Sequence, residues 1–585
     1  MHKNLHEFIE LLKKENEIKI IDAKVDPVLE IAEIQRRVAA EVGPALLFTN
    51  VKGSDFPVAT NLIGSRRRVE LAVGGKPELV IKKAVASMDQ LMSLKAKALW
   101  KERDWLFGLR KIGLKNVRSS KAPVLECMQE KVDLTKLPAL TSWPGDGGAF
   151  VTLPLVYTEH PETGAHNLGM YRIQIRGKNR TGMHWQIHKG GGFHYSIAEQ
   201  KNEPLPVTLF IGGPMALTAA AITALPESVP ELLYASFLMD DKLNRVKISE
   251  YPHPLIAEAD FAVCGYVPPK LREKEGPFGD HYGYYSLKHD FPVFHVERLY
   301  HRKNAIFPAT VVGKPRQEDY YIGEWMQDLL APMFPVIMPG VRSLWNYAET
   351  GYHSLTAAVV RETYYREAFS HAFRILGEGQ LSLTKVLMLT DADIDLRDFK
   401  TVFTTVLERF EPAKDLHIVN DTSMDTLDYT GRVYNQGSKA IIFGIGKKKR
   451  NLPKAYAGRK MAGIDKIDVY CPGCLVMSGA SYKKSPKLAE GLAASANNAL
   501  KEWPFIVLVD DTAEALETAD FLWTVFTRFD PAWDMYAKNT VRNNKIEYHS
   551  PIVIDARMKP WYPGELIPDK KISKQVDARW EELFK

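Results

Sequence analysis

The stretch HNLGMYRIQIRGKNRTGMHWQIHKGGG, residues 166–192, decides the class of fold. Apolar and polar side chains alternate at residues 171–176, as they do in a strand with one buried face. The turn-forming residues 177–179 predict a hairpin, and a second strand would follow them. The glycine-rich residues 189–192 then form a loop whose bare backbone could approach an anion closely. The composition suits a phosphate-bearing cofactor, although it matches neither the Gly-x-Gly-x-x-Gly dinucleotide fingerprint nor a P-loop.

Short β segments separated by glycine and proline extend on both sides of this hairpin. They include residues 151–157 and 293–300, and one helical insertion interrupts them at 215–239. This texture indicates a β-rich central domain, either a barrel or a sandwich. Helices and short apolar strands, such as residues 45–48, alternate before this domain and again after it, which is typical of α/β domains. We therefore expect an α/β domain at residues 1–115, a central β domain at 116–315 and a C-terminal α/β domain at 316–585.

The last third of the chain contains an internal repeat. TVLERFEPAKD at residues 405–415 matches TVFTRFDPAWD at residues 524–534 without gaps, with seven of eleven positions identical. The offset is 524 − 405 = 119 residues, and an apolar strand ending in aspartate precedes each copy at the same offset. We interpret this as structural duplication of one βα unit, because repeats generally serve packing. The alternative is a second functional site.

The overall composition excludes several classes of protein. With 77 Lys+Arg against 71 Asp+Glu, the net charge of +6 is too dilute for a nucleic-acid binder. No segment approaches the ~20 apolar residues of a membrane helix. A chain of 585 residues also exceeds the ~250–300 at which a single core stops growing, so we expect several domains.

The N-terminus resembles the start of a mature protein. Asn4 and Glu7 form a capping box, and apolar residues recur at helical spacing from Leu5 to Leu12. No apolar export segment precedes them. The four cysteines are too few for a disulfide scaffold of this size, which agrees with a reducing compartment. We expect a cytoplasmic protein, with peripheral contact at the inner membrane face as an alternative.

Cys471 and Cys474 form a Cys-x-x-Cys pair without a second pair at zinc spacing. A thioredoxin-like redox site is one interpretation. Because no redox-domain pattern surrounds the pair, we favour a turn that holds two reduced thiols.

The sharpest candidate for chemistry is EGPFGDHYGYY, residues 275–285. Pro277 fixes one φ angle and the glycines permit tight turns, so Glu275 and Asp280 can be held on one rigid loop. Two carboxyl groups in one pocket can have their pKa values pushed apart, which gives one proton donor and one ionised partner. The alternative is a surface turn that Asp280 caps. Taken singly, His184 and His188 are more often structural than metal ligands.

Four ordered motifs together resemble the UbiD family of carboxy-lyases, which are reversible non-oxidative decarboxylases. The motifs are Asn-Leu-Ile-Gly-Ser-Arg at 61–66, Asn-x4-Arg at 167–172, His-Lys-Gly-Gly at 188–191 and Glu-Gly-Pro-Phe-Gly-Asp at 275–280. The resemblance runs from Leu5 to about Asp428 and includes a short Gly-Ser-Lys match at 437–439. It implies a flavin-reductase-like split β-barrel for the central domain. The chain departs from the family by about a hundred further residues, which we expect as an extension at about 480–585.

The resemblance also implies a catalytic triad and a metal site. The triad would consist of Glu275, Arg172 and Asp280, with Asp280 as the proton donor and Glu275 tuning the pair. Asp stands where some family members have Glu, which shortens the donor's reach. A divalent metal, Mn²⁺ in preference to Mg²⁺, would bind to side chains of three residues, Asn167, Glu231 and His188.

The cofactor that the resemblance implies is prenylated FMN, together with K⁺. The flavin would serve as the electron sink that decarboxylation of an aromatic acid requires. The residues expected against it are Met170, Tyr171, Arg172, His184, Trp185, Gln186, Lys189, Gly190 and Lys439.

Three hypotheses for function follow from these features. The first is decarboxylation of a polyprenylated 4-hydroxybenzoate or a dihydroxynaphthoate in quinone biosynthesis, with a catabolic aromatic-acid decarboxylase or carboxylase as the variant within the class. The second is a flavin reductase, and the third is a non-catalytic scaffold, against which the two-carboxylate loop argues. The expected partners are the aromatic acid, a UbiX-like flavin prenyltransferase that supplies the cofactor, and further copies of the chain in a homo-oligomer.

Overall fold

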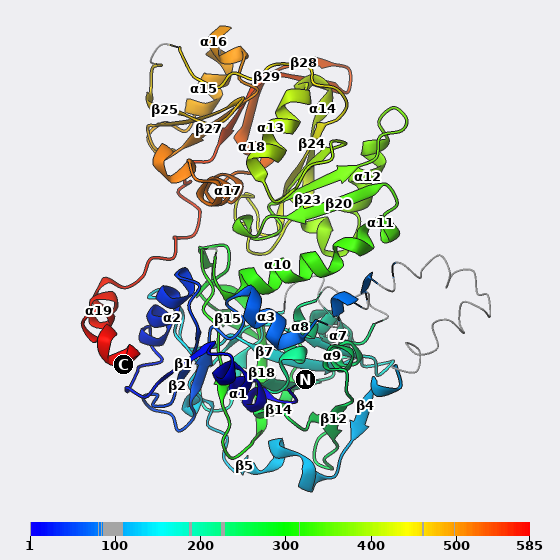
Figure 1. Ribbon diagram of the computed structural model, residues 1–585, viewed down its shortest axis with the longest axis vertical. Coiled ribbons are helices and arrows are strands. Elements are labelled where there is room, and N and C mark those ends of the chain that lie inside the picture. Colours follow the sequence, from blue (N-terminus) through cyan, green and yellow to red (C-terminus); the bar gives the residue numbers. More distant parts are fainter. Residues whose placement is uncertain are drawn as a thin grey trace, which may run out of the picture. The chain divides into compact units, whose positions relative to one another are not determined.

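The computed structural model describes residues 2–75, 77–79, 81–82, 85, 109–185, 190–223, 229–314, 316–458, 461–495 and 498–585. The chain divides into two compact units (Figure 1). The first unit comprises Met1–Leu329 with Glu565–Lys585, and the second comprises Leu330–Gly564. Throughout the ranges just given, every helix is too short or too polar to cross a membrane.

The N-terminal part of the first unit is a small sheet with helices, as expected. Its strands lie in the order β1 (Ile18–Ile21), β2 (Ala45–Phe48), β3 (Val58–Thr60) and β19 (Phe307–Pro308). Helix α1 (Leu5–Lys14) begins where predicted, because Asn4 Oδ1 accepts a hydrogen bond from the Glu7 N–H at 2.9 Å. The reciprocal half of the capping box is absent here, since the Glu7 carboxylate instead accepts from the Lys3 N–H at 2.7 Å.

An eight-stranded, mainly antiparallel sheet forms the centre of the first unit. Its main path runs β10-β18-β14-β11-β7-β8, and β15 and β5 also pair with β18. The bounds are β5 (Cys127–Gln129), β7 (Pro154–Glu159), β8 (His166–Gly169), β10 (Arg180–Gly182), β11 (Leu205–Ile211), β14 (Phe261–Val267), β15 (Arg272–Glu275) and β18 (His289–His301).

This sheet is not closed into a barrel, so the split-barrel expectation is not confirmed. Closure requires the two edge strands to pair with each other. Here the edge strands β8 and β10 are short, and within the described residues no ladder joins them. The central domain is therefore an open β-rich layer.

The hairpin predicted from residues 166–192 is only partly regular. The predicted strand at residues 171–176 is reduced to β9 (Ile173–Gln174), which pairs with β6 (Phe150–Val151). The expected glycine loop is also different, since Gly190 begins helix α7 (Gly190–Gln200). Tertiary packing accounts for the glycine itself, because a Cβ on Gly190 would lie 2.1 Å from Asn167 Oδ1.

The predicted helical insertion is confirmed, and it contains two helices, α8 (Met215–Ile222) and α9 (Glu231–Met239). The chain end also belongs to this unit. Helix α19 (Lys570–Phe584) packs on α2 (Glu30–Ala40), where Arg37 forms an ion pair with Asp577 at 2.6 Å.

The second unit consists of two copies of one α/β fold. The sheet orders are identical, β20-β21-β22-β24-β23 in the first copy and β25-β26-β27-β29-β28 in the second. The first copy contains β20 (Val341–Asn346), β21 (Leu355–Val360), α12 (Glu367–Leu376), β22 (Val386–Thr390), α13 (Phe399–Arg409), α14 (Pro412–Asp415), β23 (Leu416–Ser423) and β24 (Gln436–Gly444). The second contains β25 (Ile464–Cys471), β26 (Cys474–Gly479), α15 (Leu488–Ser495), β27 (Phe505–Val509), α17 (Thr518–Phe526), α18 (Pro531–Asp534), β28 (Met535–Arg542) and β29 (Lys545–Asp555). The duplication therefore covers a whole domain and exceeds the single βα unit that the sequence predicted.

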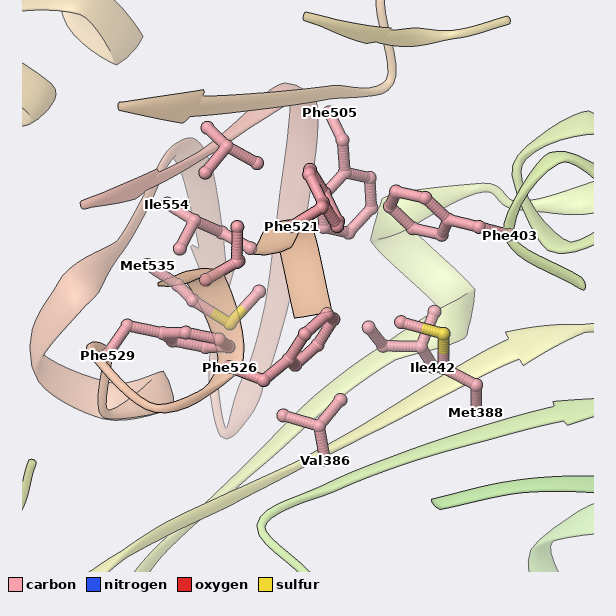
Figure 2. A pocket seen from close by; sticks show the side chains of 12 residues that line it. Val386, Met388, Phe403, Ile442, Phe505, Phe521, Phe526, Phe529, Met535 and Ile554 are labelled. Atoms are coloured by element: carbon pink, nitrogen blue, oxygen red, sulfur yellow. The ribbon is translucent and has the colours of Figure 1, made fainter. Parts of the chain in front are cut away.

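The two copies share one hydrophobic core. Along β22, Val386 and Met388 point to the shared core, while Leu387 and Leu389 pack on the copy's own outer cluster with α12. Strand β27 of the second copy alternates in the same way. Side chains of both copies line one small apolar cavity, and the Phe403 ring centroid lies 5.5 Å from that of Phe505 (Figure 2).

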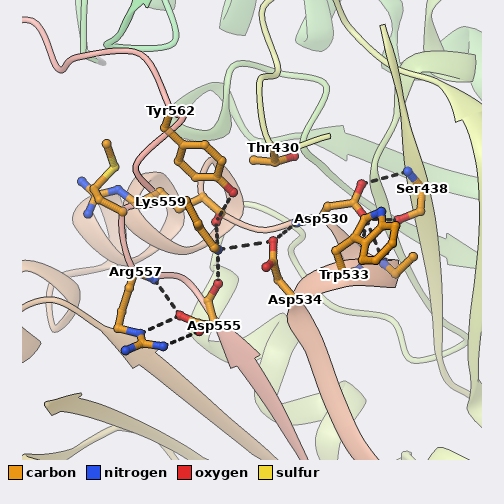
Figure 3. Close-up of polar contacts among 12 residues, drawn as sticks. Thr430, Ser438, Asp530, Trp533, Asp534, Asp555, Arg557, Lys559 and Tyr562 are labelled. Carbon is orange, nitrogen blue, oxygen red and sulfur yellow. Dashed lines mark hydrogen bonds and ion pairs between the residues drawn. The ribbon is translucent and has the colours of Figure 1, made fainter. Parts of the chain in front are cut away.

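A buried polar contact also joins the copies. The Asp530 carboxylate accepts from the Ser438 N–H at 2.9 Å and from its hydroxyl at 2.6 Å (Figure 3). Nearby, the Lys559 ammonium is bonded to Asp534 at 3.3 Å and to the Arg528 carbonyl at 2.7 Å. The acidic and basic groups labelled at this junction are bonded to one another or to Ser438, so we assign the junction to stability.

The Cys-x-x-Cys pair lies in the hairpin between β25 and β26. Cys471 and Cys474 face each other in the ladder, and both are buried and free of disulfides. Burial and the neighbouring Cys471 thiol raise the pKa of Cys474 well above its ordinary value. This environment agrees with a turn that holds two reduced thiols.

Candidate active site

Arg172 lies between the two carboxylates of the predicted triad. Its Nε and Nη2 donate to the two oxygens of Glu275 at 3.1 and 3.2 Å, and Nη1 is bonded to Asp280. Nη2 also donates to the Ser286 hydroxyl at 2.9 Å. The side chains of Arg172, Glu275 and Asp280 are 7%, 1% and 12% exposed. The three residues that the family resemblance assigned to one triad are thus in direct contact, and the site that they form is nearly inaccessible to solvent.

The loop that carries both carboxylates is built from two short β ladders. Glu275 ends β15, which pairs with β18, and Asp280 follows β16 (Phe278–Gly279), which pairs with β17 (Tyr285–Ser286). Gly276 has φ +91°, a left-handed conformation that glycine adopts without strain. The turn residues of the sequence therefore bring two acids five positions apart to the same guanidinium.

Glu275 is held as a carboxylate. Burial alone would raise its pKa, but the charge of Arg172 and the hydrogen bond from His184 lower the pKa to about 2. His184 Nδ1 lies 2.8 Å from Glu275 Oε2. Burial lowers the pKa of His184 and so favours the neutral imidazole, whose Nδ1 donates because an ionised Glu275 can only accept. The predicted cofactor residue His184 is thus a partner of the triad.

Asp280 is also ionised, with different partners. Burial would raise its pKa, but His281 and Arg172 hold the pKa well below its usual range. Asp280 Oδ1 accepts from the His281 N–H at 2.8 Å and lies 2.9 Å from the His281 Nδ1. Each carboxylate therefore has Arg172 on one side and an imidazole on the other.

Sequence reasoning missed Asp146, a third acid beside the triad. Its Oδ1 accepts from the Gly279 N–H at 2.8 Å, and its Oδ2 accepts from the Ser142 and Trp143 N–H groups at 2.9 Å. Burial raises the pKa of Asp146 to about 6, against the effect of these hydrogen bonds. The motif Pro-Gly-Asp-Gly-Gly at residues 144–148 was the available signal, since aspartate in such a turn commonly binds backbone N–H groups.

Two of the residues expected to hold the flavin, Tyr171 and Trp185, are buried beside the start of helix α7. The Tyr171 hydroxyl accepts from the Gly191 N–H at 3.3 Å, and a Cβ on Gly191 would lie 2.7 Å from Trp185 Nε1. Trp185 Nε1 is itself buried, and no other described residue accepts its hydrogen. An orphaned donor beside the N-terminus of α7 fits a ligand rich in oxygen atoms. The residues present therefore fit a phosphate-bearing flavin.

Two of the three expected metal ligands are neighbours. Asn167 lies on β8, and the N–H of the adjacent Leu168 donates to Glu231 Oε2 at 3.3 Å, where Glu231 begins α9. Burial raises the pKa of Glu231. The half-buried Glu231 carboxylate and the Asn167 amide oxygen are both ligand types that suit a divalent cation. The third expected ligand, His188, lies outside the described residues, as do Gln186 and Lys189.

Two further expected cofactor residues lie in different units of the chain. Met170 packs against the core of the first unit, directly before Tyr171. Lys439 belongs to β24 of the second unit, where its Nζ donates to the Thr384 carbonyl at 2.9 Å. Burial lowers the pKa of Lys439 to about 8. The assignment of Lys439 to the cofactor stays a prediction.

Comparison with known proteins identifies the family. The three domain models of the 3-octaprenyl-4-hydroxybenzoate carboxy-lyases match residues 9–88 (N-terminal domain), 115–315 (Rift-related domain) and 320–444 (C-terminal domain). The chain is 48% identical over 582 residues to a 4-hydroxybenzoate decarboxylase subunit of Chlamydia pneumoniae, with 99% of this chain and 98% of the relative covered. The chain therefore belongs to the UbiD family, and it is a carboxy-lyase.

Solved structures have the same fold over most of the chain. The UbiD-class enzyme HmfF from Pelotomaculum thermopropionicum, solved in complex with FMN, is 25% identical with a TM-score of 0.63. Vanillic acid decarboxylase from Sedimentibacter hydroxybenzoicus in its closed form is 24% identical with a TM-score of 0.67. The matches cover 79% of this chain and 98% and 97% of those chains. The uncovered fifth is close in length to one repeat of 119 residues.

Proposed function

We propose that the protein decarboxylates a hydroxyaryl carboxylic acid with prenylated FMN as its cofactor. The observation that carries this proposal is Arg172 bonded to both Glu275 and Asp280 in a nearly dry site. The substrate is a polyprenyl-4-hydroxybenzoate or a dihydroxynaphthoate, used in the synthesis of ubiquinone or menaquinone. The printed name of the chlamydial relative, a 4-hydroxybenzoate decarboxylase, supports the aromatic-acid class.

The residues of the triad have separate tasks in this proposal. Arg172 binds the substrate carboxylate, since its guanidinium carries several N–H donors in one plane. Substrate binding neutralises part of the Arg172 charge and so raises the proton affinity of the adjacent acids. Asp280 delivers the proton that replaces carbon dioxide. Glu275 stays ionised between Arg172 and His184 and keeps Arg172 oriented.

The cofactor and metal assignments rest on the family resemblance and on the local fit. Prenylated FMN, when bound, accepts the electron pair that loss of carbon dioxide leaves behind. Tyr171, Trp185 and Gly190 would hold it, together with Met170 and the undescribed Gln186 and Lys189. Asn167, Glu231 and His188 would bind Mn²⁺, and K⁺ would accompany it. The FMN bound to the related HmfF supports the flavin assignment.

The partners proposed are a UbiX-like flavin prenyltransferase that supplies the cofactor, and further copies of the chain in a homo-oligomer. A polyprenyl substrate would also require peripheral contact with a membrane, because its tail is insoluble in water. The protein would otherwise act in the cytoplasm.

The alternative function is a catabolic decarboxylase of the same family. Family membership favours both of these decarboxylases over a flavin reductase.

One experiment tests the proposal. The chain is co-expressed with a flavin prenyltransferase, the bound cofactor is weighed by mass spectrometry, and carbon dioxide release is followed with 4-hydroxybenzoate, its prenylated form and a dihydroxynaphthoate. We expect prenylated FMN and turnover of one of these acids. Glu275→Gln and Asp280→Asn should lower the rate by about 10²-fold or more. Plain FMN that turns over with NADH would contradict the proposal.

A further inference from the structure

The Asp280 side chain has a small set of polar partners. One oxygen is bonded to Arg172, and the other accepts from the His281 N–H at 2.8 Å and lies 2.9 Å from the His281 ring nitrogen Nδ1. Arg172 cannot release a proton at any working pH. Of these two partners, His281 is therefore the one whose side chain can both lose and regain a proton.

Asp280 does not carry a proton in the resting site. Arg172 and His281 both stabilise its carboxylate, and the pKa of Asp280 lies well below its usual range. A donor that starts each cycle ionised must receive a proton within the cycle. The question is which group supplies it.

The two imidazoles of the site differ in their access to water. The His184 side chain, bonded to Glu275, is 7% exposed, whereas the His281 side chain is 28% exposed. The titratable and charged groups around His281 include Asp280, the Arg172 guanidinium bonded to Asp280, the neighbouring Tyr282 and Asp319 of α10 (Glu318–Leu330). Burial raises the pKa of Asp319, which the positive charge of His281 opposes. His281 thus lies between the buried Asp280 carboxylate and solvent.

We propose that His281 is the proton relay that supplies Asp280 in each catalytic cycle. The imidazolium transfers its Nδ1 proton to Asp280 Oδ1, which leaves a neutral imidazole and a neutral carboxylic acid. Asp280 then gives this proton to the carbon atom that has lost carbon dioxide and returns to the carboxylate. The imidazole regains a proton from water, so charge and protons balance over the cycle. The inference rests on the decarboxylase proposed above.

The test compares the cofactor-loaded parent with His281→Gln and His281→Ala. Glutamine keeps an N–H donor for Asp280 but cannot relay a proton. We expect both variants to bind the cofactor normally and to turn over about 10²-fold more slowly. The rate of the parent should fall as His281 loses its proton with rising pH, and this limb should vanish in both variants. Added imidazole should restore the rate of His281→Ala in proportion to the imidazolium concentration.

His549→Gln is the matched control, because His549 is exposed and bonds Thr540 in a hairpin of the second unit. It should leave the rate and its pH profile unchanged. A His281→Gln variant that matches the parent in rate and pH profile would overturn the relay. So would a slow His281→Ala variant that retains cofactor but does not respond to imidazole, because His281 would then only position Asp280. A loaded parent that releases no carbon dioxide from any acid would instead refute the proposed function.

Discussion

Asp146 Oδ1 accepts the Gly279 N–H at 2.8 Å, one residue before Asp280. Asp146 thereby fixes the backbone that carries the proposed proton donor, while its second oxygen closes the turn at Ser142 and Trp143. All three of these hydrogen bonds come from backbone N–H groups. The contribution of Asp146 is to hold the position of the loop.

The first prediction concerns this contact. Asp146→Ala leaves three N–H groups without their acceptor, which should destabilise the first unit by about 1–3 kcal/mol. Displacement of Asp280 should lower kcat by up to about 10²-fold. Asp146→Asn keeps one carbonyl oxygen as an acceptor, so its stability and its kcat should lie between those of the parent and of Asp146→Ala. Asp133→Ala is the control, since Asp133 accepts the backbone N–H of Thr135 in an exposed turn. Equal kcat in Asp146→Ala and Asp133→Ala would contradict the prediction.

The second prediction is a pH dependence of stability. Because the pKa of Glu275 is lowered to about 2 from the usual 4.5, the folded state holds this proton less tightly than the unfolded state. The stabilisation is fully present above about pH 4.5 and is lost as the pH falls toward about 2. It amounts to about 3 kcal/mol at neutral pH. Urea unfolding of the parent and Glu275→Gln between pH 7 and pH 3 should show a difference that shrinks with falling pH. A constant difference would show that the carboxylate charge does not contribute.

The third prediction concerns the start of α7. In Gly190→Ala the added methyl would lie 2.1 Å from Asn167 Oδ1, so either the helix or Asn167 must move. We expect weaker binding of both flavin and metal, measured by absorbance and by metal analysis after dialysis. Gly491→Ala is the control, because Gly491 lies in helix α15 with open space around it. That change should stabilise the second unit by about 0.5–1 kcal/mol. Unchanged flavin and metal content in Gly190→Ala would count against the site.

The fourth prediction uses the pseudo-equivalence of the two copies. Asp530 is fully buried, bonds Ser438 of the other copy and caps α18 through the Ala532 N–H at 3.0 Å. Asp530→Ala should cost about 3 kcal/mol of unfolding free energy. Glu411 is its counterpart 119 residues earlier, and the Glu411 carboxylate bonds the exposed Lys414. Glu411→Ala should therefore cost less than about 1 kcal/mol. Calorimetry of the two variants would decide, and equal effects would refute the assigned role of Asp530.

Local patterns in the sequence predicted local structure well. The Asn4 cap and the strand at 45–48 are as expected, because each depends on neighbours in the chain. The spacing at residues 275–285 predicted that Glu275 and Asp280 share a loop, and the family resemblance added Arg172, which contacts both carboxylates in the structure. Asp146 and His281 were missed. The turn motif at residues 144–148 marks Asp146 as an acceptor for backbone N–H groups, but its partner Gly279 lies 133 residues further along the chain.

Tertiary packing explains the predictions that were incomplete. The glycines at 190 and 191 suggested a loop but lie in helix α7, where they are needed because Asn167 and Trp185 leave no room for side chains. Sequence identity reveals the repeat only at residues 405–415 and 524–534. Elsewhere most of the buried strand residues differ between the copies, although apolar residues still alternate along each strand. The full extent of the duplication therefore becomes evident only from the identical strand orders of the two sheets.

The shared core of the second unit has a consequence for how this protein can be divided. A duplicated domain is usually modular, so that one copy can be excised and studied alone. Here Phe403 and Phe505 lie in the same cluster, and the inner faces of the two sheets cover each other. A cut in the linker at about residue 450 would expose the apolar inner face of each sheet to water, and both fragments would be prone to aggregate. The two halves of the unit should therefore melt in one transition, because the pair of copies is the unit of folding in this chain.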